Sequence, residues 1–210
     1  MNRIDAHQHF WKFDLVRDSW ITDEMSNIKK DFLPADLLPL LQQNNFEGCV
    51  AIQADQSEEQ NDFLIDLAKE NNFIKGIVGW VDLKASDLEM KLEHYKKHPI
   101  IKGFRHVLQA ETDRKFMLDP QFMKGIGLLA KNNFTYDILI YTDQLQYINR
   151  FVAEFPEQKF VIDHLAKPNI KEKSIEEWES DIYAVSEYEN VYCKISGMVT
   201  ETDWKHWEQH

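Results

Sequence analysis

The sequence predicts an α/β fold with parallel strands, and three observations support this prediction. Short apolar runs recur along the chain with helix-like segments between them. Residues typical of helix starts precede several of these segments. No GxGxxG motif follows the first apolar run, which argues against a dinucleotide-binding sheet. Parallel strands need crossover segments between them, and of the two common parallel folds we favour a (β/α)8 TIM barrel over an open doubly wound sheet.

Seven of the eight strands of such a barrel are expected in this chain. The apolar runs that predict them span residues 3–7, 48–54, 75–81, 101–107, 135–140, 159–163 and 190–195. The chain has 210 residues, so we expect one barrel domain over residues 1–210.

The helix starts are the best-marked local features. Three serines are followed by Glu or Gln at the spacing of a capping box: Ser57 with Gln60, Ser86 with Glu89, and Ser174 with Glu177. Asp119 before Pro120 predicts a fourth start, because proline at the first helical position gives up an amide that would be unpaired there. The spacing of Leu145, Ile148 and Phe151 predicts one further helix with a single buried face.

Composition limits the partners and the compartment. Lys and Arg total 24 against 36 Asp and Glu, and the net charge of −12 argues against nucleic acid and anionic membranes as partners. No run approaches the about 18 apolar residues of a membrane span. The two cysteines, Cys49 and Cys193, each lie in an apolar stretch, which predicts buried thiols. We therefore expect the protein in a reducing cytoplasm.

The first predicted strand ends in His7 and His9. Residues two apart on a strand project to the same side, so the two imidazoles could bind one divalent ion. An isolated HxH is also common by chance, and a polar strand end is the alternative. A metal site therefore needs further polar residues at the ends of other strands, where barrel active sites are built.

Polar residues occur at the ends of two further strands and inside two others. His164 follows Asp163 at the end of one strand, and Arg105 with His106 lies near the end of another. His106 could equally be a core histidine with one backbone partner. Asp137 and Lys194 lie inside apolar runs, and each needs a partner or a ligand because an unpaired buried charge is costly.

Taken in order, seven stretches resemble the amidohydrolase family 2 proteins, and more narrowly the branch with L-fuconolactone and L-rhamnonolactone hydrolases. They are RIDAHQHFWKF, VAIQADQSEEQNDFLIDLA, IVGWVDL, IKGFRHVLQ, FMLDPQFMKGIGLLAKNNFTYDILIY, FVIDHLAKP and VYCKISGMVTETDW. The resemblance runs from residue 3 to the end of the chain and implies a distorted (β/α)8 barrel of the amidohydrolase type.

The resemblance also implies roles for individual residues. His7, His9 and His164 match the metal ligands, and His164, His106 and Arg105 are the catalytic candidates. The candidates for substrate contact are Gln53, Tyr136, Asp137 and Lys194. Trp80 joins them because it lies near a strand end and could stack on a sugar ring, although isolated aromatic residues more often lie in a core.

One part of the family pattern is not found. Family members complete the site with an aspartate on the eighth strand, in a segment resembling FGSDWP, and this sequence has no such segment. The chain resembles roughly the first three quarters of a family member, so we expect a C-terminally incomplete barrel. An open edge would expose unpaired backbone groups, which predicts self-association into a homo-oligomer.

The chemistry that the resemblance implies is hydrolysis of a cyclic ester, a sugar aldonolactone. We expect a divalent metal, zinc, as cofactor and a small molecule as substrate. Some relatives work without metal, so metal-free catalysis stays open. The alternatives are a related decarboxylase, a phosphoesterase whose first strand also ends in HxH, and a truncated barrel without catalytic activity.

Overall fold

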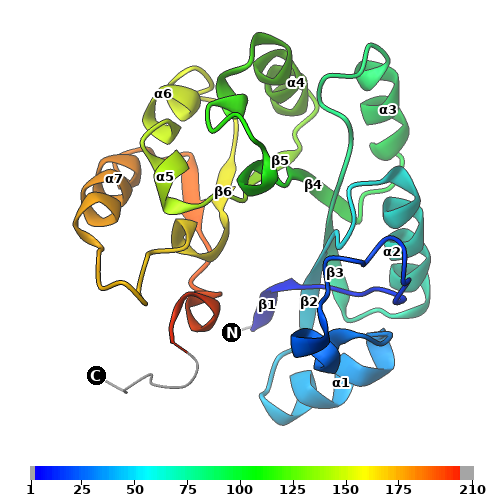
Figure 1. Cartoon of the computed structure of the whole chain (residues 1–210). Helices are drawn as coiled ribbons and strands as arrows, with labels where there is room; N and C mark the ends of the chain where they lie inside the picture. The colour runs from blue at the N-terminus through cyan, green and yellow to red at the C-terminus, as the bar shows by residue number, and fades with distance from the viewer. Residues whose placement is uncertain (1–2, 204–210) are drawn as a thin grey trace. The chain divides into compact units, whose positions relative to one another are not determined.

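The computed structural model describes residues 3–203. The chain forms two compact units, which meet in sequence between Trp80 and Val81. Strands and helices alternate along each unit (Figure 1). The predicted alternation is therefore present in both.

Three parallel strands make up the sheet of the first unit. They are β1 (Ile4–Gln8), β2 (Gly48–Ile52) and β3 (Ile74–Gly79). The helices between them are η1 (Asp23–Ile28), a 3-10 helix, followed by α1 (Pro34–Gln43) and α2 (Glu58–Glu70). The register between β1 and β2 shifts between Asp5 and Gln8, so β1 is irregular in the part that contains His7.

Four parallel strands make up the sheet of the second unit. They are β4 (Ile101–His106), β5 (Thr135–Ile138), β6 (Phe160–Ile162) and β7 (Val191–Cys193), paired in that order. The α-helices are α3 (Leu88–Tyr95), α4 (Pro120–Lys131), α5 (Thr142–Leu145), α6 (Ile148–Ala153) and α7 (Glu176–Ser186). Short helical turns follow three strands: η2 (Leu108–Ala110), η3 (Phe116–Leu118), η4 (Asp163–Ala166) and η5 (Met198–Glu201).

All seven predicted strands are confirmed, and two of the four predicted helix starts are. Ser57 Oγ accepts from the Gln60 amide at 3.3 Å, and Asp119 accepts from the amides of Gln121 and Phe122 at 2.8 and 3.0 Å. The other two predictions are wrong. α3 begins after Asp87 rather than Ser86, and α7 begins after Ile175, because Ser174 is used in a backbone bridge to Asn169.

The helix predicted through Leu145, Ile148 and Phe151 is interrupted. It forms α5 and α6, which are separated by Gln146 and Tyr147. The Gln146 side-chain amide donates to the Asp143 carbonyl at 2.9 Å and so takes an acceptor near the end of α5. The three apolar side chains are nevertheless fully buried, as the spacing predicts.

Each unit has a buried apolar core. In the first unit, Cys49, Ile52 and Ile77 from the strands are fully buried, with Leu64 from α2. The second unit has an aromatic core, in which Tyr136 of β5 lies 5.9 to 6.4 Å, between ring centroids, from Phe122, Phe151 and Phe160. Aromatic pairs at such distances add stability beyond their buried area.

Both cysteines are free thiols, and only one lies where the sequence predicts. Cys49 is buried as expected, and burial raises the pKa of its thiol to about 12. Cys193 is exposed, so the prediction of a buried thiol there is wrong. It lies on β7, whose three residues are all at least partly exposed, unlike those of β2. Within residues 3–203, no helix has the length and apolar character needed to cross a bilayer.

Asn61 of α2 fixes the path of the chain after β3. Its side chain is fully buried, donates to the Trp80 carbonyl at 2.7 Å and accepts from the Trp80 amide at 2.8 Å. A Cβ atom on Gly79 would lie 2.3 Å from the Asn61 Oδ1 atom, so this approach needs glycine at position 79. The Asn61 side chain thus forms the two backbone hydrogen bonds that a neighbouring strand would otherwise form with Trp80.

We predict that Asn61→Ala lowers the free energy of unfolding by about 2–4 kcal/mol, because the amide and carbonyl of Trp80 would each lose a partner. Urea denaturation followed by tryptophan fluorescence measures this change. Asn72→Ala, at an exposed position, is the control and should stay within about 0.5 kcal/mol of the parent. Equal midpoints for the two variants would contradict the proposed role of Asn61.

Candidate active site

His7 and His9 lie side by side at the end of β1. Their Nε2 atoms are 3.1 Å apart, and the His7 amide donates to Asp5 Oδ1 at 3.0 Å. Two nitrogens bound to one zinc ion at about 2.0–2.1 Å would be separated by a similar distance, roughly 3.3 Å. The spacing of this pair therefore fits two adjacent ligands of one divalent ion.

The second ring nitrogen of His9 defines its tautomer. Nδ1 lies 3.0 Å from the carbonyl oxygen of Ile52, at the end of β2. A carbonyl only accepts hydrogen bonds, so Nδ1 carries the proton and Nε2 presents its lone pair. Hydrogen bonds of this kind are the usual way in which proteins orient a metal-binding histidine. The chemistry of the pair thus also fits a metal.

Gln53 and Trp80 follow the neighbouring strands of the same unit. Gln53 is 1% exposed, and its backbone amide donates to the Val78 carbonyl at 2.8 Å. Asn61 holds the Trp80 backbone, and the indole nitrogen of Trp80 is buried without a hydrogen-bond partner among the described residues. Both residues therefore lie at carboxyl ends of strands, the position that the predicted substrate contacts require.

A network of four charges joins the strand ends of the second unit. Asp163 Oδ2 accepts from Arg105 at 2.9 Å, and its Oδ1 lies 2.9 Å from the Lys194 ammonium. Lys194 also makes a close ion pair with Asp137. Asp137 and Asp163 are almost completely buried, and Arg105 is 5% exposed. Paired in this way, the four groups satisfy one another in a setting where a single charge would be strongly unfavourable.

The network changes the proton affinity of Asp137. The pKa of its carboxyl is raised to about 6: burial is the largest cause, the Lys194 ammonium opposes it, and the Asp163 carboxylate adds to it. The carboxyl of Asp137 therefore titrates much closer to neutrality than an ordinary aspartate.

His164 lies on an unusual turn directly after Asp163. Four successive residues from His164 to Lys167 have positive φ angles of 54–55°. Side chains disfavour this left-handed conformation, so the surrounding structure must hold it. Thr142 Oγ1 donates to the Lys167 carbonyl at 2.7 Å, and the Trp178 indole donates to the Leu165 carbonyl at 2.6 Å.

The His164 ring is held by the loop after β7. Its Nδ1 lies 2.9 Å from the hydroxyl oxygen of Ser196. Gly197 follows with a φ of 72°, and a Cβ atom there would lie 2.7 Å from three atoms of His164. The ring therefore packs against backbone that no other residue type could provide.

Two of the predicted site residues lie apart from the charge network. His106 follows Arg105 on β4, and Tyr136 precedes Asp137 on β5. Because side chains alternate along a strand, both point to the face of the sheet opposite the network. His106 stacks on Phe116 at 5.3 Å, and its Nε2 lies 2.7 Å from Glu111 Oε1. Tyr136 is fully buried in the aromatic core. His106 resembles the core histidine of the alternative prediction, with a carboxylate rather than a backbone partner.

Sequence reasoning left three residues of this region unassigned. Asp163 is the centre of the charge network, and its position between an apolar run and His164 is a signal that could have identified it. Ser196 and Gly197 contact His164 from a different strand. No local sequence pattern predicts that contact, because it depends on the pairing of β6 with β7.

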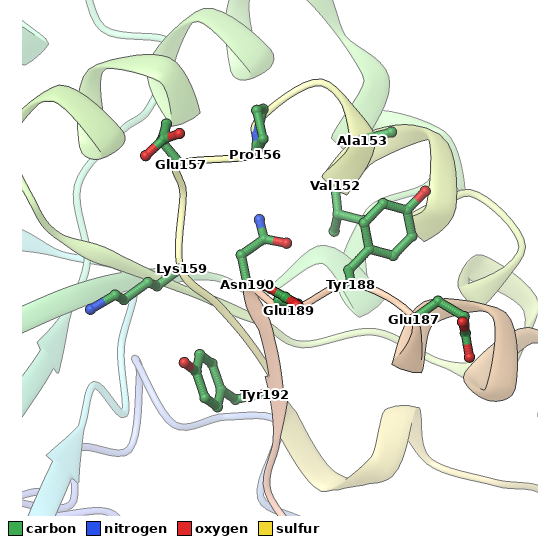
Figure 2. Close-up of a pocket in the computed structure, with 10 residues that line it drawn as sticks. All are labelled: Val152, Ala153, Pro156, Glu157, Lys159, Glu187, Tyr188, Glu189, Asn190 and Tyr192. Atoms are coloured by element: carbon green, nitrogen blue, oxygen red, sulfur yellow. The ribbon is translucent and has the colours of Figure 1, made fainter.

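A pocket of about 500 Å³ lies elsewhere in the second unit (Figure 2). It is lined by residues from 152–159 and 187–192, which lead into β6 and β7. Figure 2 shows Tyr188, Asn190 and three glutamates around it. The pocket is at the amino ends of these strands, whereas Asp163 and Lys194 follow their carboxyl ends. The charge network therefore does not line it.

Comparison with known proteins gives consistent results. The sequence profile of the amidohydrolase family matches residues 4–210. An L-fucono-1,5-lactonase of Burkholderia multivorans is 34% identical over 209 residues, which cover 97% of this chain and 70% of that protein. An L-fucono-1,5-lactonase of Burkholderia ambifaria is 33% identical, over 95% of this chain and 69% of its own length.

A solved structure agrees with these matches. The crystal structure of an amidohydrolase from Burkholderia multivorans with bound zinc superposes with a TM-score of 0.93 at 34% identity, over 98% of this chain and 73% of its own. This likeness confirms the predicted fold class, an amidohydrolase-type (β/α)8 barrel of which the described residues supply seven strands. The chain belongs to the amidohydrolase family, a family of hydrolytic enzymes.

Proposed function

We propose that this protein hydrolyses a cyclic ester of the sugar-lactone class, a small-molecule substrate. The observation that carries the proposal is the pair of histidines at the end of β1, whose Nε2 atoms lie 3.1 Å apart with the tautomer of His9 fixed by a carbonyl. The substrate class follows from the relatives, which are named L-fucono-1,5-lactonases and are 33–34% identical to this chain.

His7 and His9 would hold a divalent metal, and zinc is the ion that we propose because the related amidohydrolase structure contains it. His164 is added as a further ligand by the sequence resemblance. A bound zinc ion supplies Lewis acidity, which polarises a carbonyl group and makes water a better nucleophile near neutral pH. The other roles fall to the side chains of this chain.

Arg105 and Lys194 are proposed to orient the lactone. Ester hydrolysis develops negative charge on the carbonyl oxygen and releases a carboxylate, and cations at fixed positions favour both. The two side chains are held by Asp163 before substrate arrives, so little reorganisation is needed. Gln53, Asp137 and Trp80 complete the proposed contacts with the sugar. His106 and Tyr136 are left out, because His106 pairs with Glu111 and Tyr136 lies in the core.

We predict that the purified chain, supplied with zinc, opens aldonolactones and that His9→Ala or His164→Ala lowers the rate at least about tenfold. Acid release in weakly buffered solution with a pH indicator measures the rate. His94→Ala changes an exposed histidine on α3 and is the matched control, for which we expect the parent rate.

Zinc binding separates the proposed activity from a non-catalytic barrel. Calorimetric titration should show one zinc ion per chain, with the affinity lowered at least about tenfold in His9→Ala but not in His94→Ala. Zinc binding without turnover of any aldonolactone would favour the non-catalytic alternative. Full turnover in both His9→Ala and His164→Ala would exclude the proposed site.

We also predict a carboxyl titration near pH 6 that belongs to Asp137. Because the pKa is raised from 3.8, the native state binds more protons than the unfolded state between these values, so this group's contribution to stability falls as pH rises through about 6. Lys194→Met removes the opposing ammonium and should raise the midpoint further. Carbon-13 NMR of labelled aspartates measures it.

Lys69→Met is the control for this titration, because Lys69 pairs with the exposed Asp66. It should leave the Asp137 midpoint unchanged. A midpoint that moves to lower pH in Lys194→Met would contradict the electrostatic role assigned to that lysine.

A further inference from the structure

The loop after β7 contacts two consecutive residues after β6. Lys194 pairs with Asp163 at 2.9 Å, and Ser196, two residues further on, contacts Nδ1 of His164 at 2.9 Å. The Lys194 amide donates to the Ile162 carbonyl at 2.9 Å, which extends the β6–β7 pairing to this point. The loop is therefore fixed at its start by both backbone and charge.

The chain directly after Ser196 is also held in place. Gly197 adopts a left-handed φ of 72°, and its carbonyl accepts from the Thr200 amide at 3.0 Å and the Thr200 hydroxyl at 2.6 Å. Its missing side chain lets the backbone approach the His164 ring, which a Cβ atom would meet at 2.7 Å. Ser196 thus stands between two anchored residues, with its hydroxyl on the imidazole.

The partner of Nδ1 matters because it determines what Nε2 can do. A protonated Nδ1 leaves a lone pair on Nε2, whereas a proton on Nε2 makes that atom a hydrogen-bond donor. For His9 a carbonyl makes the choice. A serine hydroxyl has both a proton and lone pairs, so for His164 the hydroxyl has to act as the acceptor to give the same outcome.

We propose that Ser196 is a positioning residue for His164: its hydroxyl accepts from Nδ1–H, orients the ring on its left-handed turn and presents the Nε2 lone pair to the reaction centre. Gly197 makes this contact sterically feasible. The inference rests on the proposed function for the use made of Nε2, but the hydrogen bond and the tautomer are properties of the protein itself. Hydrogen-bond partners of metal-binding histidines typically contribute about 10–100-fold to metal affinity or activity, because they orient the ligand.

The test is nitrogen-15 NMR of histidine-labelled protein without metal, which reports the tautomer of each ring. We expect His164 in the Nδ1–H form in the parent chain, a mixture of tautomers in Ser196→Ala, and recovery of the parent spectrum in Ser196→Thr, which keeps the hydroxyl. Ser186→Ala is the matched control, because the Ser186 hydroxyl donates to the Tyr183 carbonyl on the exposed surface of α7. An Nε2–H tautomer in the parent, or an unchanged His164 spectrum in Ser196→Ala, would overturn the proposal.

Zinc titration adds a functional readout. The dissociation constant should rise about tenfold in Ser196→Ala and stay within about twofold in Ser196→Thr. Gly197→Ala is a second variant, which should disturb the His164 signals while Ser196 is intact. If the parent binds no zinc and opens no lactone, the proposed function fails, yet the tautomer measurements still decide the role of Ser196. Equal zinc affinities of the parent and Ser196→Ala would count against that role.

Discussion

The buried carboxylate of Asp163 is the constraint around which the second unit is organised. It accepts from Arg105 of β4 and pairs with Lys194 after β7, and Lys194 also pairs with Asp137 of β5. Four consecutive strands are therefore tied together at their carboxyl ends by side chains. Loss of one member would leave a buried charge uncompensated, which costs about 3–5 kcal/mol in comparable cases.

The same carboxylate links the packing of the strands to the proposed ligand His164. His164 is its neighbour in sequence, so the ion pairs that hold Asp163 also fix where the turn with the left-handed residues begins. Two independent attachments then reach consecutive residues from one loop, Lys194 on the carboxylate and Ser196 on the imidazole. These contacts form without a ligand, and such preorganised charges and dipoles are the arrangement expected if the proposed site performs electrostatic catalysis.

Features that a few neighbouring residues determine can be predicted from the sequence, whereas features that depend on contacts between distant residues cannot. The seven strands were predictable, since each is an apolar run of a few residues with its own boundary signals. Ser57 and Asp119 were predictable as caps for the same reason. Ser174 was not, because a bridge to Asn169 competes for its backbone.

The candidate site was predictable in part. Arg105, Asp137, His164 and Lys194 all occupy strand ends, as their positions in the sequence indicate. His106 and Tyr136 are each adjacent to a network residue on the same strand and face the opposite side, a placement that the alternation of side chains along a strand could have predicted. The role of Gly197 could not be read from sequence at all, because it follows from a contact with a residue 33 positions earlier.

The turn from His164 to Lys167 has a consequence for how the protein could be altered. Four residues with side chains adopt a conformation that costs about 1–2 kcal/mol each, so the folded state carries a local penalty at the proposed ligand His164 and the residues after it. Glycine at Leu165 or Ala166 would relieve part of that penalty and would also loosen the turn. Laboratory selection for heat resistance and selection for turnover should therefore diverge at these two positions.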